Sequence, residues 1–171
     1  MVGKRIFLKL LAPIDITKSY VDWMQDEEAI QFLESRFKKY TLDDIKKYIE
    51  QTNDGINNFM FGIYLKEKDE HIGNIKIGGI DHIHRFANVG VLIGNKEMWG
   101  KGYGTEAIKM ATQYAFNELD LHKLIAGIYA NNIGSYNAFM KAGYREVGRL
   151  RNHRLYKEKF VDEILVENEK N

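Results

Sequence analysis

The stretch that decides the fold is Trp99-Gly100-Lys101-Gly102-Tyr103-Gly104-Thr105-Glu106-Ala107, in which three glycines alternate with other residues. Residues 87–94 before it alternate as a strand does, and an amphipathic helical pattern follows it. Glycine lets backbone N–H groups converge without side chains in the way, and a helix N-terminus adds unpaired N–H donors. This strand–turn–helix arrangement predicts a phosphate-binding turn.

Two common nucleotide-binding motifs do not match this turn. A P-loop requires Gly-Lys-Ser/Thr four residues after its first glycine, and the sequence has none here. A dinucleotide fingerprint requires a βαβ unit with an acidic residue after its second strand, whereas this turn follows an antiparallel meander. The remaining alternative is that the glycines only make a tight connection.

Composition limits the classes of protein further. The chain has 171 residues, of which 44% are apolar and 29% charged, so we expect one globular domain over residues 1–171. A net charge of +1 with no basic stripe argues against nucleic-acid and membrane partners. The absence of cysteine excludes disulfides, thiolate metal sites and a cysteine nucleophile, and we expect no metal. No signal peptide or membrane-spanning run is evident, so the expected location is cytoplasmic.

Periodicity and turn residues predict the order β-α-α-β-β-β-α-β-α-β-β, an α/β or α+β fold with a mixed sheet. Asp15 is expected to cap the first helix, and Thr41 to Asp44 resemble a capping box. Residues 34–40 have no clean period and are predicted to form a loop. The predicted strands are 4–11, 57–66, 72–80, 86–93, 123–130, 144–151 and 157–166, and the later helices run to about 119 and over 133–142.

Several spaced motifs resemble the GNAT N-acetyltransferases. The glycine turn looks like their acetyl-CoA pyrophosphate loop, and three later segments match in order and spacing: residues 119–124, Asn132 with Ser135, and residues 141–144. The similar branch includes the ribosomal-protein N-terminal, spermidine and polysaccharide amino-sugar acetyltransferases. The resemblance implies a mostly antiparallel seven-stranded sheet, splayed between strands 4 and 5, with about four helices.

The resemblance also implies which residues bind acetyl-CoA. The strand edge at Val91, Leu92 and Ile93 would pair with the pantetheine arm, and an N–H near Leu92 would stabilise the oxyanion. Asn132 would bond the pantetheine or act as a plain helix cap, and Lys101 would help electrostatically or be a surface lysine. The remaining expected contacts are Gly100, Gly102, Tyr103, Gly104, Thr105, Phe139 and Lys141.

The sequence departs from the family at both proton-transfer positions. Phe139 stands where a tyrosine acid is common, so Ser135 is the substitute acid that we favour. Asn88 stands where a glutamate base is common, which leaves His84 or ordered water to take the amine proton. Further base candidates are Asp81, His82 and Glu34, and each histidine equally fits a solvated loop.

The acceptor is expected beside the loop that carries Glu34, Arg36 and Lys38, with His82 nearby. Basic residues there suit an anionic acceptor such as a nucleotide-linked amino sugar, or they only keep the loop soluble. A protein N-terminus, a polyamine and a non-catalytic CoA-binding module remain as alternatives. The chain is expected to act as a monomer or homodimer.

Overall fold

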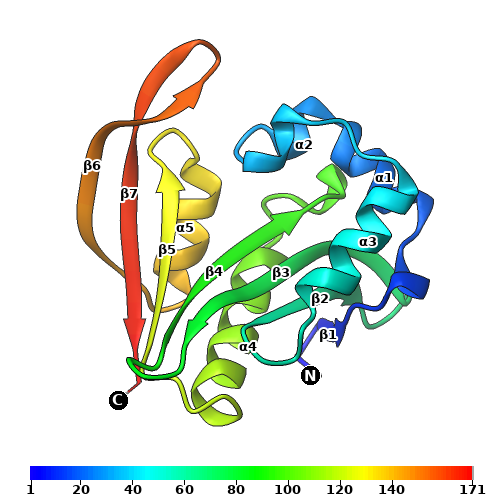
Figure 1. The fold of residues 1–171 in the computed structure, drawn as a ribbon, viewed down its shortest axis with the longest axis horizontal. Coiled ribbons are helices and arrows are strands. Elements are labelled where there is room, and N and C mark those ends of the chain that lie inside the picture. The colour runs from blue at the N-terminus through cyan, green and yellow to red at the C-terminus, as the bar shows by residue number, and fades with distance from the viewer. Residues whose placement is uncertain (171) are drawn as a thin grey trace.

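The computed structural model describes residues 1–170. Within them the chain forms seven strands, five α-helices and three short 3-10 helices (Figure 1). The strands are β1 Ile6–Leu10, β2 Asn58–Leu65, β3 Glu70–Asp81, β4 Phe86–Ile93, β5 Lys123–Tyr129, β6 Arg145–Tyr156 and β7 Lys159–Glu169. The helices are α1 Lys18–Gln25, α2 Glu27–Ile30, α3 Leu42–Thr52, α4 Tyr103–Asn117, α5 Ile133–Lys141, η1 Pro13–Asp15, η2 Glu34–Phe37 and η3 Lys96–Met98.

The strands form one sheet in the order β1-β2-β3-β4-β5-β7-β6. All neighbours are antiparallel except β4 and β5, which run parallel and pair only at Phe86–Lys123, Ala87–Leu124 and Asn88–Ile125. Beyond these pairs the two strands diverge, as Figure 1 shows for β4 and β5. The predicted fold class, a mixed seven-stranded sheet splayed between strands 4 and 5, is therefore confirmed.

Most local expectations agree with the structure, and three do not: the role of Asp15, the loop at residues 34–40, and the strand predicted over 144–151, which runs to Tyr156 as β6. The Thr41 hydroxyl accepts from the Asp44 amide while the Asp44 carboxylate accepts from the Thr41 amide, so the predicted capping box starts α3. Asp15 does not cap α1, because its carboxylate accepts from the Ala12 amide inside η1 and the helix begins after Thr17. The predicted loop at residues 34–40 contains η2.

Two apolar clusters cover the two faces of the sheet. The larger joins the sheet to α4 and α5 and includes Ile75, Ile108 and Phe139. The smaller lies under α1 and α3 and includes Trp23 and Ile49. None of the helices in residues 1–170 is long and apolar enough to cross a membrane.

Candidate active site

A cleft of about 500 Å³ lies where β4 and β5 diverge. Its walls come from α2, the end of β4, the glycine turn, the end of β5 and α5. We call this the β4–β5 cleft, and the sequence-predicted residues that line it are Val91, Leu92, Ile93, Gly100, Gly102, Tyr103, Gly104, Thr105, Asn132, Ser135, Phe139 and Lys141.

The glycine turn is shaped by two left-handed residues. Gly100 has φ +72° and Gly102 has φ +83°, conformations that residues with a side chain rarely adopt. Gly102 is the N-cap of α4, so the first amides of that helix start at the cleft. Lys101 does not line the cleft. Its carbonyl accepts from Arg5 Nη1 at 2.8 Å, which ties the turn to the start of β1.

The free edge of β4 presents backbone amides to the cleft. The Gly94 amide donates to the Ile72 carbonyl at 2.9 Å, and Leu92 lies opposite Asn74 in the β3–β4 register. Bonded and non-bonded pairs alternate along an antiparallel ladder, so Leu92 exchanges its backbone bonds with Asn74. The amides of Val91 and Ile93 therefore point toward β5, beyond the three β4–β5 pairs. These two amides, rather than that of Leu92, face the cleft.

Helix α5 supplies the opposite wall of the cleft. The side-chain oxygen of Asn132, Oδ1, caps the helix by accepting from the Ser135 amide at 3.1 Å. Phe139 is buried and meets the Tyr144 ring edge-on, with 4.9 Å between the ring centroids. Tyr136 faces elsewhere and donates to Glu146. Ser135 is therefore the hydroxyl residue that this face of α5 brings to the cleft.

A second cavity, of about 630 Å³, lies on the α1–α3 face of the sheet. We call it the α1–α3 cavity. It shares Leu33, Gly90, Val91 and Leu92 with the β4–β5 cleft, and a Cβ atom at Gly90 would have nothing within 4 Å. The two cavities thus meet at β4. The other residues that line it are Tyr20, Met24, Glu34, Ser35, Phe37, Lys38, Tyr40, Ile45, Tyr48, Met60, Asn74 and Lys76.

The loop residues predicted to bind the acceptor divide into two groups. Glu34 and Lys38 line the α1–α3 cavity. Arg36 does not, because its guanidinium donates at 2.6 Å to the carbonyls of both Leu33 and Leu155. These bonds hold η2 against the β6–β7 hairpin and leave Arg36 as a structural residue.

Glu34 belongs to a network that links η2 to β5, β6 and β7. Its Oε1 accepts from the Tyr129 hydroxyl at 2.7 Å and from Arg154 Nη1 at 3.3 Å. Arg154 also donates to the buried Glu163 at 2.6 Å. Burial, together with the bond to Glu34, raises the pKa of Tyr129. Tyr129 therefore stays protonated at neutral pH.

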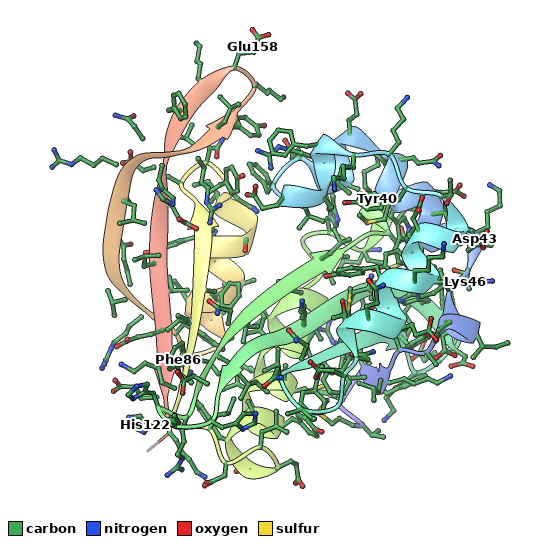
Figure 2. All side chains as sticks on the ribbon, viewed as in Figure 1. Tyr40, Asp43, Lys46, Phe86, His122 and Glu158 are labelled. Carbon is green, nitrogen blue, oxygen red and sulfur yellow. The ribbon has the colours of Figure 1, made fainter. Side chains whose placement is uncertain are left out.

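The structure does not bring His82, His84 or Asn88 to either cavity. The two histidines lie in the β3–β4 turn, where the Arg85 carbonyl accepts from the His122 amide at 2.6 Å. Figure 2 labels Phe86 and His122 at this closed end of the splay and Tyr40, which lines the α1–α3 cavity, near the other end of β4. Distance along β4 thus separates the histidines from the site, and Asn88 pairs at the same closed end.

Sequence reasoning missed most of the residues that line the α1–α3 cavity, among them Gly90, Asn74 and Lys76. Asn74 and Lys76 are two residues apart on β3 and so share a face. That spacing is the available signal, since it places two polar side chains on the face of the strand opposite Ile75 and Ile77. Among residues 1–170, no group of three or more His, Cys, Asp or Glu side chains is placed to hold a metal ion.

A splayed sheet with a glycine turn at the mouth of the splay is the arrangement that the resemblance to the N-acetyltransferases implied. The family model for the acetyltransferase (GNAT) domain matches residues 5–145. The chain therefore belongs to the GNAT family and is an acyltransferase of the N-acetyltransferase type, as the motifs predicted.

Relatives agree with this assignment. The probable N-acetyltransferase YjcK of Bacillus subtilis (strain 168) is 30% identical over 155 residues, 85% of this chain and 83% of the relative. The spermidine N(1)-acetyltransferase of Escherichia coli (strain K12) is 33% identical over 81 residues, 47% of this chain and 43% of the relative.

Solved structures share the fold. The ribosomal-protein-S5-alanine acetyltransferase from Vibrio fischeri has a TM-score of 0.86 at 17% identity, covering 100% of this chain and 96% of its own. The Vibrio cholerae spermidine N-acetyltransferase, solved with CoA and spermine, has a TM-score of 0.84 at 19% identity, with 96% and 95% covered. Both structures share the fold of this chain over nearly its whole length.

Proposed function

We propose that the protein transfers an acetyl group from acetyl-CoA to the primary amine of a small acceptor by direct attack. The observation that carries the proposal is the meeting of two cavities at residues 90–92 of β4. One cavity has a glycine turn for phosphates, and the other lies on the opposite side of the same strand. Two substrates entering from the two sides would meet at one point, so no covalent enzyme intermediate is required.

The residues of the β4–β5 cleft fit CoA. The amides around Gly100 to Thr105 and the start of α4 suit a pyrophosphate, and Lys141 adds a positive charge at the cleft. The cleft-facing amides of Val91 and Ile93 suit the pantetheine arm and the developing oxyanion. Acetyl-CoA supplies the acetyl group as a thioester, and its thiolate is a fair leaving group because a thiol has a pKa of about 8.5.

The two proton transfers are assigned to different walls. Ser135 on α5 is the proposed donor to the departing sulfur, because Phe139 has no proton to give. Ordered water in the α1–α3 cavity is the proposed acceptor of the proton that the incoming ammonium loses, because Glu34, the carboxylate that lines this cavity, is already bonded to Tyr129 and Arg154. His84 has no part in this proposal because it lies at the closed end of the splay.

The geometry favours a small-molecule amine over the nucleotide-linked amino sugar expected from the sequence. Arg36, the residue best suited to a diphosphate, is engaged with two backbone carbonyls. A polyamine requires several acidic contacts, and Glu34 is already bonded to Tyr129 and Arg154. A protein N-terminus and a non-catalytic CoA-binding module remain competing outcomes of the test.

The test measures thiol release from acetyl-CoA against a panel of small amines, polyamines and peptide N-termini. We expect release with at least one small amine and none with Gly102→Val, because a β-branched residue at φ +83° distorts the turn. Calorimetry with CoA and a thermal melt accompany the assay. Tight CoA binding without thiol release from any amine would assign the protein as a binding module instead.

A further inference from the structure

Asn74 carries an unused hydrogen-bond donor at the point where the two cavities meet. His71 Nε2 lies 2.9 Å from the Gly73 carbonyl oxygen and 2.9 Å from Asn74 Oδ1. Both oxygens only accept, so Nε2 bears the hydrogen and the amide oxygen of Asn74 is fixed toward His71. Nδ2, the nitrogen of the same side-chain amide, is therefore the end that does not bond His71. It is buried and has no hydrogen-bond partner among residues 1–170, although Asn74 lines the α1–α3 cavity.

A buried NH₂ group without a partner is costly, so a native structure is expected to provide one. Asn74 lies directly opposite Leu92 in the ladder, and Lys76 lies directly opposite Gly90. Both side chains therefore project from β3 beside the point on β4 where the cavities join. A ligand oxygen bound to Nδ2 would lie close to the reacting amine.

The charged side chains of the cavity also favour an acceptor with a negatively charged oxygen. Lys76 and Lys38 line it, and within residues 1–170 neither forms a salt bridge. Lys76 Nζ lies 5.7 Å from the centre of the Tyr48 ring, on the cavity wall. The negative charge of Glu34 is offset by Arg154. An acceptor that enters this cavity therefore meets an amide donor and two ammonium groups among its lining residues.

The rest of the wall is apolar and aromatic, with Tyr20, Met24, Tyr40, Tyr48 and Met60. An acceptor that fits all of these lining residues has three features. It has an amine at the point on β4 where the cavities join, a negatively charged oxygen a short distance from that amine, and an apolar body. We propose that the acceptor is a free α-amino acid with an apolar side chain, whose carboxylate binds Asn74 Nδ2 and Lys76. This inference rests on the proposed function, since it takes the α1–α3 cavity as the acceptor site.

The test is calorimetric titration of the CoA-saturated protein with three acids and their derivatives. The acids are L-leucine, L-methionine and L-phenylalanine, each compared with its amide, which models a peptide N-terminus, and with its decarboxylated amine. We expect at least one acid to bind tenfold or more tightly than both of its derivatives. Lys76→Met and Asn74→Leu should each reduce that preference to less than threefold. Lys47→Met, on the exposed side of α3, is the matched control and should retain it.

Equal binding of acids and derivatives would overturn the inference, as would the absence of binding by all three acids. If Asn74→Leu unfolds, the Lys76→Met result alone decides. Thiol release is measured in a parallel assay with the same acids and derivatives, in which acetyl-CoA replaces CoA. Selective binding without thiol release would overturn the proposed function, and with it the role of the bound amino acid as acceptor. Thiol release without selective binding would overturn the inference alone.

Discussion

Gly90 is one of the four residues that line both cavities, and it has no side chain to stand between them. Its φ lies outside the left-handed region and a Cβ would meet nothing within 4 Å, so a larger residue fits the backbone. We predict that Gly90→Val keeps or slightly raises the thermal midpoint, since valine suits a strand better than glycine. The added methyl groups would separate the reacting groups, so kcat/KM should fall by about 100-fold or more. Gly148→Val on β6, where a Cβ has ordinary contact with Leu165, is the control that should retain activity.

Ser135 is the second residue whose role is open to a direct test. If it protonates the departing thiolate, Ser135→Ala should lower kcat by roughly tenfold, below the usual effect of a general acid because a thiolate leaves readily. The affinity for CoA should stay unchanged. Adding Phe139→Tyr to that variant places a phenol on the same helix face, one turn along, and should restore part of the lost rate. An unchanged kcat in Ser135→Ala would show that the thiolate leaves unaided.

At the scale of elements, the glycine turn depends on β1 as well as on α4. Arg5 Nε donates to Glu106 Oε2 at 2.9 Å, and Glu106 Oε1 accepts from the Arg5 amide. Arg5 also holds the Lys101 carbonyl, although it lies outside the cleft. We predict that Arg5→Ala raises the dissociation constant for CoA by roughly fivefold, which corresponds to about 1 kcal/mol. Lys4→Ala also removes one positive charge and should leave the calorimetric affinity for CoA unchanged. An equal loss of affinity in Lys4→Ala would mean that Arg5 acts through its charge alone.

The contact between η2 and the β6–β7 hairpin is the other arrangement that shapes the site. Tyr156 donates to Gln31 at 2.6 Å beside the Arg36–Leu155 bond. Arg36→Ala leaves two carbonyls without a charged donor, so we predict a loss of about 2 kcal/mol, or roughly 4–8 °C in the thermal midpoint. The affinity for anionic acceptors should change little beyond this. An unchanged midpoint with a tenfold higher acceptor KM would restore Arg36 as an acceptor ligand.

Across the whole molecule, the sequence predicted what depends on local pattern. Alternation, glycine placement and the Thr41–Asp44 cap predicted the strands, the turn and the helix starts, and motif spacing predicted the family. It could not predict that Arg36 bonds Leu155, because that contact joins residues 119 positions apart. It also could not place His84, which lies in the β3–β4 turn. Sequence alone does not tell whether this turn is at the open or the closed end of the splay between β4 and β5; the strand register does. Asn74 and Gly90 became functional candidates only when the two cavities were seen to meet.

The stability of the whole fold should also depend on the buried His71. Burial lowers its pKa below the ordinary 6.5, and the bonds to Asn74 and Gly73 oppose this only in part. The unfolded chain therefore takes up a proton near pH 6.5 that the folded chain does not. Its contribution to stability is complete above pH 6.5 and is lost as the pH falls below it, with a slope of at most about 1.4 kcal/mol per pH unit.

Urea denaturation between pH 5 and 8 checks this dependence. Carboxylates such as Glu106 titrate in a lower range, because burial raises its pKa less than the bonds from Arg5 and Ile6 lower it from 4.5. The slope between pH 6.5 and 5 should therefore come mainly from His71 and should largely disappear in His71→Gln, which keeps a donor for the Gly73 carbonyl. His82→Gln, in the exposed β3–β4 turn, should leave the slope intact. An unchanged slope in His71→Gln would mean that the folded protein protonates His71 as readily as the unfolded chain does.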